Sequence, residues 1–242
     1  MDRKDKIAFA KKQIASKWKC DPAVFDLEKN VFFTSSDTFF EIITFGTNAV
    51  IRADETILDW CSEKFLSVLA RDIMDGDNLY NLETMLRSLG KKLSGEHIGY
   101  LHIFPEKEVP KPEGFIFRLF VGSEIEELRS SVDYKDFDNA FSPDKDRDVL
   151  AIAAYDGGTI AAIAGSDDYL GSLWQIGIDT ELSYRNRGLG AYLVKEITSE
   201  IEKRHKVAYY NTWSPNIAST KVALSIGFYP VWMGYPSEKI NS

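Results

Sequence analysis

The sequence predicts an α/β (α+β) protein with a mixed central sheet flanked by helices. Residues 171–191, GSLWQIGIDTELSYRNRGLGA, are typical of an apolar strand that runs through a polar turn into a glycine-bearing helix start. The stretch VAYYNTW, from Val207, is typical of a second strand, and a short helix follows it. The proline-rich stretch at 105–114, PEKEVPKPEG, predicts a linker. It divides a smaller α+β domain, residues 1–110, from the main domain, residues 111–242.

Composition limits the class of protein. The chain has 242 residues, 44% of them hydrophobic, which is enough for a sizeable core. It has no apolar run near the ~18 residues that a membrane span needs, and its first residues lack the apolar stretch of a signal peptide, so we expect a cytoplasmic protein with no membrane partner. The net charge of −8 would repel a phosphate backbone, so we expect no nucleic-acid partner.

The candidate metal ligands do not form a recognisable site. Cys20 and Cys61 make no metal-type or CxxC pair, and two reduced, mostly buried thiols are expected. His97 and His102 lie five residues apart in a strand-like run and therefore on opposite faces. Zinc needs convergent ligands, so we expect no metal site.

The N-terminal region alternates helical and strand patterns. Asp54 is expected to cap one helix, and Gly46-Thr47-Asn48 is expected to turn a hairpin. The expected elements are a helix at 3–18, strands at 31–33, 38–44 and 49–53, a helix at 55–71, a second helix that ends near Gly90, and a strand around 97–104.

The C-terminal region predicts the order strand, helix, helix, strand, strand, strand, helix, strand, helix, strand. Asp156-Gly157-Gly158 predicts a hairpin turn, and the helix after the glycines places an apolar residue at every fourth position from Leu189 to Ile201. The expected elements are a strand at 115–121, a helix from Ser123, a polar stretch to 148, strands at 149–155, 159–164 and 171–178, a long helix from 189, a strand at 207–213, and a helix before Gly227-Phe228.

The start of the long helix is a predicted anion site. Arg185, Arg187, Gly188 and Gly190 fall within six residues. Backbone N–H groups at a helix N-terminus are unpaired, the helix dipole adds positive charge there, and glycine permits close approach of a ligand. Leu193 stands where a dinucleotide fingerprint needs a small residue, and no P-loop is present. A capped helix entered through a glycine turn, with a solvated arginine pair, is the alternative interpretation.

The spacing Arg185-x-x-Gly188-x-Gly190 resembles the pyrophosphate-binding signature of the GNAT superfamily of acyl-CoA N-acyltransferases. The later Asn216, followed across one short helix by Gly227-Phe228, resembles the second segment of that family. The resemblance covers the chain from about residue 115 to its end. It implies a GNAT-type mixed sheet for the main domain, and it leaves open whether residues 1–110 are a degenerate copy of the same fold.

The resemblance implies acetyl-CoA as cosubstrate, with its pyrophosphate on the helix start and its pantetheine along the strand at 173–178. An amine of a small molecule or peptide would attack the thioester carbonyl directly, and a backbone N–H would stabilise the oxyanion. Gly177 is expected to mark a bulge where the strand opens for the ligand. Asn216 and Ser219 have helix capping as an equal alternative. The expected acetyl-CoA-binding residues are Ile176, Ile178, Arg185, Arg187, Gly188, Leu189, Gly190, Ala191, Asn216 and Ser219.

The catalytic residues are not predicted with the same specificity. In many members of the family a Tyr four residues before the Gly-Phe pair protonates the departing thiolate, and here that position is Ala223. Tyr229 and Tyr184 are candidate substitutes, and Asp167 and Asp168 are the closest carboxylates to the strand. Tyr229 and Asp168 therefore stand as weak catalytic candidates. A noncatalytic acyl-CoA-binding or sensing protein, an enzyme for protein amines, and a homodimer stay open.

Overall fold

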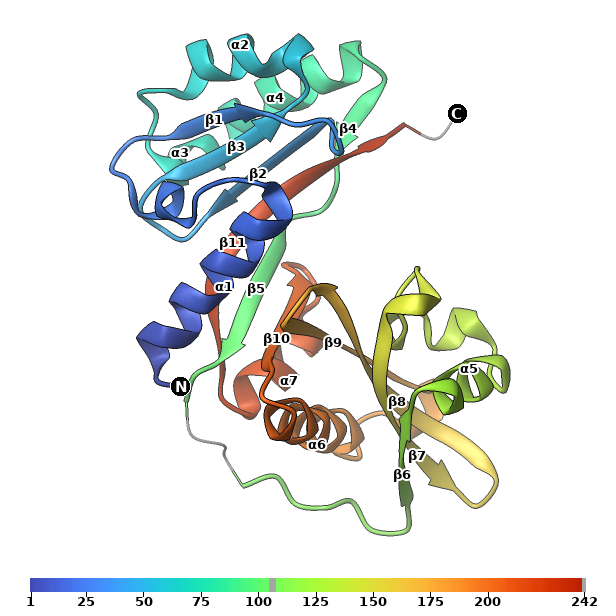
Figure 1. Ribbon diagram of the computed structural model, residues 1–242. Helices are drawn as coiled ribbons and strands as arrows, with labels where there is room; N and C mark the ends of the chain where they lie inside the picture. The colour runs from blue at the N-terminus through green and yellow to red at the C-terminus, as the bar shows by residue number, and fades with distance from the viewer. Residues whose placement is uncertain (105–107, 241–242) are drawn as a thin grey trace. The chain divides into compact units, whose positions relative to one another are not determined.

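The computed structural model describes residues 1–104 and 108–240, which form two compact units (Figure 1). Unit 1 comprises Met1–Gln13, Tyr100–Thr212 and Asn216–Tyr229, and unit 2 comprises Ile14–Gly99, Trp213–Pro215 and Pro230–Ser242. The units are therefore interleaved along the chain. The division into domains at residue 110 stays a prediction, and residues 105–107 of the predicted linker lie outside the described residues.

Unit 2 is an α+β structure around a mixed sheet with the strand order β1-β3-β2-β11, in which β4 pairs with the far end of β11. Strand β1 is parallel to β3, and β2 forms the expected antiparallel hairpin with β3. Its elements are η1 (Pro22–Asp26), β1 (Val31–Thr34), β2 (Phe40–Thr44), β3 (Ala49–Ala53), α2 (Glu55–Phe65), α3 (Ala70–Ile73), α4 (Gly76–Ser88), β4 (Lys91–Leu93) and β11 (Phe228–Lys239).

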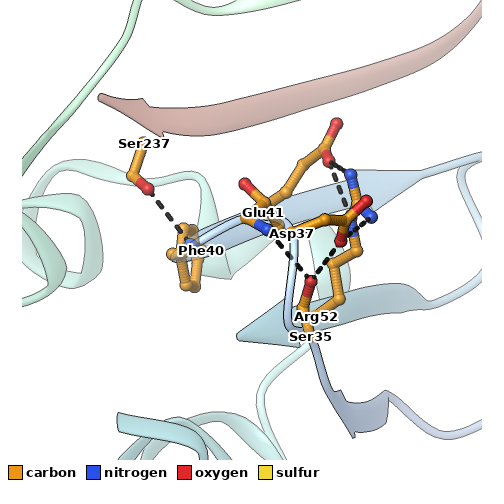
Figure 2. Close-up of polar contacts among 7 residues, drawn as sticks. Ser35, Asp37, Phe40, Glu41, Arg52 and Ser237 are labelled. Carbon is orange, nitrogen blue, oxygen red and sulfur yellow. Dashed lines mark hydrogen bonds and ion pairs between the residues drawn. The ribbon is translucent and has the colours of Figure 1, made fainter. Parts of the chain in front are cut away.

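A buried ion pair joins the two strands of the unit 2 hairpin (Figure 2). Arg52 of β3 is 5% exposed, and its Nε and Nη2 donate to Glu41 Oε2 of β2 at 2.9 and 2.6 Å. Its Nη1 also donates to Asp37 Oδ1 at 3.1 Å. Burial raises the pKa of Glu41, and the guanidinium opposes that rise. Glu41 and Arg52 are register partners in the hairpin, so the pair is a direct cross-strand contact that favours this register.

Unit 1 is built on a sheet with the strand order β5-β10-β9-β8-β7-β6. All neighbours from β6 to β9 are antiparallel, and β9 and β10 are parallel. Its elements are β5 (His97–His102), β6 (Ile116–Val121), α5 (Ser123–Ser130), η2 (Tyr134–Asp136), η3 (Asp138–Ala140), η4 (Lys145–Arg147), β7 (Asp148–Asp156), β8 (Thr159–Leu170), β9 (Leu173–Thr180), η5 (Leu182–Tyr184), α6 (Leu189–Lys203), β10 (Val207–Trp213) and α7 (Ile217–Ser225).

Helices cover the two faces of the unit 1 sheet differently. Helix α6 packs on β7, β8 and β9 and also contacts α7, and Figure 1 shows these two helices together beside β9 and β10. On the other face, Ile125 and Leu128 of α5 join Phe137 and Phe141 in a cluster over β7 and β8. Residues 165, 177 and 179 point to this second face, because cross-strand partners share a face and side chains alternate along a strand.

Most of the expected elements are present, with three differences. Helix α1 (Arg3–Trp18) has the predicted bounds, whereas the helix expected at 55–71 ends at Phe65 and leaves Leu66 and Leu69 exposed. The second helix expected after Ser123 is replaced by the short turns η2, η3 and η4, from which Phe137 and Phe141 still reach the cluster over β7 and β8. Strand β8 continues to Leu170 and reaches the unexpected bulge between Asp167 and Leu170.

Two absences concern only the described residues. The helices of 1–104 and 108–240 include none that is both long and apolar enough to cross a bilayer. Within the same ranges no group of three or more His, Cys, Asp or Glu side chains is placed to hold a metal ion.

Candidate active site

The central feature of unit 1 is the separation of two parallel strands. Strand β10 pairs with β9 from Val207–Leu173 to Tyr210–Ile176, and the pairing stops there. Both strands continue beyond that point, β9 to Thr180 and β10 through Thr212. The facing backbone groups of residues 177–180 are therefore available to a ligand on this side, because a strand edge without a partner presents N–H and C=O groups. The strand separation that the sequence associates with Gly177 begins at this residue.

Helix α6 begins beyond the open end of β9. Gly188 is its N-cap, with φ 80°, a left-handed conformation that glycine adopts without steric cost. No side chain caps this end and no acidic residue lies in the first turn. The N–H groups of Leu189, Gly190 and Ala191 thus have no intrahelical acceptor, since the first such bond is Tyr192 N–H to Gly188 O at 3.1 Å. The arrangement suits an anion.

The predicted Gly190 lies where the start of α6 meets α7 and β9. A Cβ built on Gly190 would lie 3.7–3.9 Å from Val222 of α7 and from Thr180 and Ile178 of β9, which is ordinary contact. The predicted residues Ile178, Gly188 and Gly190 are therefore gathered at one place. Leu189 contributes only backbone there, because its side chain is 1% exposed and belongs to the core.

The two arginines of the loop make only local contacts. Arg185 Nε donates to Thr180 O at 3.2 Å, which holds the loop against the end of β9. The guanidinium of Arg187 lies 5.1 Å from the ring centre of Tyr184. Both residues are exposed, so each retains donors for an anion. Their role in phosphate binding stays a prediction.

Asn216 and Ser219 lie at the start of α7. Asn216 Oδ1 accepts from Ser219 N–H at 3.1 Å, so Asn216 is the N-cap of the helix and its capping role is confirmed. The Ser219 hydroxyl is 2.6 Å from the hydroxyl of Tyr210. Tyr210 is the last β10 residue paired with β9, so this hydroxyl pair stands where the strands part. Burial raises the pKa of Tyr210 to about 12.

Gly177 has a different role from the predicted bulge. Its pairing with Gly165 of β8 is regular, and the irregularity of that ladder lies between Asp167 and Leu170. A Cβ on Gly177 would collide with the carbonyl oxygen of Asn139, and one on Gly165 with that of Ala140. The two glycines therefore form a notch that receives the backbone of η3. Sequence reasoning missed this, because only the fold brings residues 138–140 to β9.

Asp179 fixes the same turn. Its Oδ2 accepts from Asn139 N–H at 2.7 Å and from Ala140 N–H at 3.1 Å, and its Oδ1 accepts from Asn139 Nδ2 at 3.0 Å. Burial raises the pKa of Asp179, while these hydrogen bonds oppose the rise. The carboxylate is thus a structural clamp beside the open strands.

A row of polar side chains crosses the sheet on the face that carries η3. Asp167 of β8 is opposite Gln175 of β9, which is opposite Tyr209 of β10. The Tyr209 hydroxyl donates to Gln175 Oε1 at 2.6 Å. One residue pair further along, Asn211 has a buried Oδ1 with no hydrogen-bond partner in the described chain. The row ends beside Ile176, where the strands part.

Asp167 is a half-buried carboxylate beside this row. Its Oδ1 accepts from Tyr169 N–H at 2.9 Å. Burial, and next the charges of Asp148 and Asp168, raise the pKa of Asp167 to about 6. A carboxyl group with this pKa is mostly ionised at neutral pH and is suited to proton transfer.

The catalytic candidates named from the sequence lie in ordinary surroundings. Tyr229 is 42% exposed and packs on Phe104, with the guanidinium of Arg3 at 5.5 Å from its ring. Asp168 Oδ1 lies 3.7 Å from Arg147 Nη1. Ala223 is fully buried. These contacts assign no chemistry, so both candidates stay predictions.

One neighbour of the anion site gave no signal in the sequence. Pro112 Cγ would lie 3.9 Å from a Cβ on Gly188, which places part of the stretch expected to be a linker beside the loop. The Nζ of the adjacent Lys111 lies 5.5 Å from the ring centre of Phe117. A lysine in a proline-rich stretch has no motif, and only the fold brings it here.

Comparisons with known proteins give one family match and several similar folds. Residues 123–228 match the model of the acetyltransferase (GNAT) family. A GCN5-related N-acetyltransferase-like protein from Streptococcus suis has a similar structure, with a TM-score of 0.50, 15% identity, and coverage of 67% of this chain and 69% of that one.

Two further solved structures resemble the chain. A protein assigned to the GNAT family, from Novosphingobium aromaticivorans, has a TM-score of 0.47 and 19% identity over 63% of this chain and 69% of that one. A Drosophila protein has a TM-score of 0.49 and 12% identity over 97% of this chain and 88% of that one. No curated protein matches the sequence. Residues 123–228, which match the model of the acetyltransferase (GNAT) family, include the open strands, the start of α6 and the polar row.

Proposed function

We propose that this protein is an N-acetyltransferase that transfers the acetyl group of acetyl-CoA to a primary amine by direct attack. The separation of β9 and β10 after Ile176–Tyr210, with the uncapped N-terminus of α6 beyond it, carries the proposal. An elongated ligand with a phosphate at one end fits these two features together. The pyrophosphate takes the N–H groups of residues 188–191, and the pantetheine pairs with the free edge of β9.

The length of the free edge sets where the reaction occurs. Four residues separate Thr180 from Ile176, which is ~13 Å of extended strand. The thioester then lies at Ile176 and Gly177, where a backbone N–H of β9 stabilises the oxyanion, an effect worth about 3 kcal/mol. The amine attacks the carbonyl carbon, the C–N bond forms, and the C–S bond breaks with its electron pair on sulfur.

The hydroxyl pair of Tyr210 and Ser219 is placed to assist the departing thiolate, which must take up a proton. It lies at the point of strand separation, on the α7 side. Tyr210 is a weak acid here, and a thiolate is a good leaving group, so the hydroxyls serve chiefly as hydrogen-bond donors to sulfur. We also propose a cytoplasmic location, which the free thiols of Cys20 and Cys61 support.

The test is a calorimetric titration of the full chain with acetyl-CoA, coupled to thiol release with polyamines, amino acids, aminoglycosides and basic peptides. Binding with acceptor-dependent thiol release is expected, and the active acceptors identify the substrate class. An absence of binding would refute the assignment of the loop at 185–190.

A noncatalytic acyl-CoA sensor is the second candidate, and the buried Ala223 favours it, because that position offers no proton donor. It predicts acetyl-CoA binding without thiol release for any acceptor. The control is acetyl-CoA with acceptor in the absence of protein, which gives the uncatalysed rate of thiol release.

A further inference from the structure

We propose that Asp167, Gln175 and Tyr209 form the site for the acceptor's amine, in which the Asp167 carboxylate takes the proton of the incoming ammonium. The assignment rests on the proposed function and goes beyond it by naming the residues that meet the acceptor. It depends on the face of the sheet on which these residues lie, on their position along the strands relative to the thioester, and on the contacts that each neighbouring carboxylate makes.

The face is decided by the helices. Helix α6 covers the sheet over β7, β8 and β9, and its N-terminus belongs to the phosphate end of the cosubstrate. The acceptor therefore reaches the thioester from the opposite face. Gln175 and Tyr209 are on that face together with Asp167, because register partners in neighbouring strands point the same way.

The level along the sheet is decided by the pairing of β9. The thioester lies at Ile176 and Gly177, the first place where β9 is free of β10. Gln175 precedes this place by one residue, and Asn211 of β10 stands beside it with a buried, unpartnered Oδ1. That oxygen can accept a hydrogen bond from the acceptor or from a pantetheine amide.

The choice among carboxylates is decided by their hydrogen bonds. Asp148 accepts from Ser142 N–H at 2.7 Å and from Arg129 Nη1 at 2.9 Å. Asp179 uses both oxygens to hold η3. Asp168 pairs with Arg147. Among the described residues, Asp167 has neither a clamping set of hydrogen bonds nor an ion-pair partner within 4 Å, and Tyr169 N–H is the donor to its Oδ1.

The charges around Asp167 suit this role. Asp148 faces it from β7, Asp168 follows it in the chain, and Arg147 of η4 lowers its pKa. Tyr209 on β10 has its own pKa raised, first by burial and then by the charge of Asp167. Burial and the carboxylate neighbours prevail, so the pKa of Asp167 is about 6. At neutral pH the group is ionised and attracts a cation, and it still accepts a proton readily.

The proton balance closes without another reactant. The acceptor arrives as R–NH3⁺, and one proton passes to Asp167 and then to water. The nitrogen lone pair attacks the thioester carbon, the C–N bond forms, and the C–S bond breaks. A second proton passes from nitrogen to the thiolate, and the third stays on the amide. Gln175, held by Tyr209, positions the nitrogen.

The test uses ethylamine as the probe, because it is a small primary amine that is protonated at neutral pH. The full chain and its Asp167→Asn variant are compared for acetyl-CoA affinity by calorimetry and for ethylamine-dependent thiol release across pH 5 to 9. The matched control is Asp136→Asn, the same isosteric change at an exposed carboxylate of η2. Tetramethylammonium, a cation with no N–H, controls for charge alone.

We expect Asp167→Asn to bind acetyl-CoA within about twofold of the wild type and to release thiol about a hundredfold more slowly. In the wild type, kcat/KM should rise with pH through about 6. Asp167→Asn should lose this rise, whereas Asp136→Asn should keep it. Tyr209→Phe should raise the KM for ethylamine severalfold and change kcat less, because it frees Gln175 and leaves the carboxylate. Tetramethylammonium should release no thiol.

Three outcomes would overturn the assignment while leaving acetyl-CoA binding in place. In the first, the wild type binds acetyl-CoA but does not accelerate thiol release with ethylamine. In the second, Asp167→Asn keeps the rise of kcat/KM through about pH 6. In the third, Asp168→Asn loses that rise instead. A wild type that does not bind acetyl-CoA overturns the proposed function itself, so the two failures are distinguishable. Circular dichroism of each variant shows that it is folded.

Discussion

Gly188 is the residue on which the anion site depends most directly. It has φ 80° and lies exposed at the N-cap of α6. In Gly188→Glu a carboxylate would stand where we propose that the pyrophosphate binds, and the left-handed backbone would be strained. We expect acetyl-CoA affinity to fall at least tenfold in calorimetry.

The matched control for that change is Gly157→Glu. Gly157 also has positive φ, at 58°, and open space around it, but it lies in the β7–β8 hairpin. It should show the same backbone strain with unchanged affinity. Equal losses of affinity in the two variants would mean that strain, and not charge at the phosphate site, is the cause.

Asp167 also determines how stability depends on pH. Its pKa is 3.8 in an unstructured chain and about 6 in the fold, so the folded state binds its proton more tightly. Protonated Asp167 therefore stabilises the fold below about pH 4, and that stabilisation is lost as pH rises through about 6. At pH 7 we expect Asp167→Asn to be more stable by about 1–2 kcal/mol, although less active.

Denaturant unfolding at pH 4 and pH 7 checks this expectation, since the gain in stability should vanish at the lower pH.

Glu202→Gln should have the opposite effect on stability. The His102 hydrogen bond is the main cause that lowers the pKa of Glu202 to about 2, so its stabilising effect is present above about pH 4.5 and is lost as pH falls through about 2. This variant should lose stability at pH 7. A gain there would contradict the assigned ion pair with Lys6 and His102.

At the scale of elements, the η3 turn depends on the notch between β8 and β9. Gly177→Ala would place a Cβ against the carbonyl oxygen of Asn139, which is backbone and cannot rotate away. We expect a loss of about 1–3 kcal/mol in the free energy of unfolding. Acyl transfer should also fall, because η3 lies on the same face of the sheet as the proposed acceptor site of Asp167, Gln175 and Tyr209. Gly158→Ala, in a hairpin with open space, is the control and should change neither quantity by much.

The hairpin of unit 2 depends on its buried charges in the same way. Arg52→Met keeps most of the side-chain volume but leaves Glu41, whose side chain is 27% exposed, without its partner. We expect a loss of about 1–3 kcal/mol at pH 7 by denaturant unfolding. The double variant Arg52→Met with Glu41→Gln should recover part of it, and no recovery would show that the cost is packing and not charge.

At the scale of the whole molecule, the interleaving of the units affects any attempt to divide the chain. Unit 1 includes Met1–Gln13 and the end of β5. Within Met1–Gln13, Lys6 donates a hydrogen bond to Glu202, and Gln13 accepts one from Ser172 N–H. A fragment of residues 111–242 lacks both. We expect it to be largely unfolded by circular dichroism and by NMR dispersion, whereas the full chain is folded. A stable, dispersed fragment would establish residue 110 as a folding boundary.

Local sequence determined most of the elements and the glycine turn into α6. Alternation and helical spacing set most strands and helices, Asp54 and Asn216 are the expected caps, and Gly188 lies at the expected helix start. These features depend on contacts between residues near in sequence, which periodicity and glycine positions encode. The resemblance to the acetyltransferase family was visible for the same reason, because it rests on two local segments, the loop at 185–190 and the stretch from Asn216 to Phe228.

The tertiary structure decided what lies far apart in the chain. The row of Asp167, Gln175 and Tyr209 exists because three strands align in register, and the notch at Gly165 and Gly177 exists because η3 reaches it. No local pattern distinguishes Asp167 from Asp168, because the strand register places Asp167 opposite Gln175 and the fold brings Arg147 to Asp168. Strand register and burial result from packing across the whole sheet, so no local pattern specifies them.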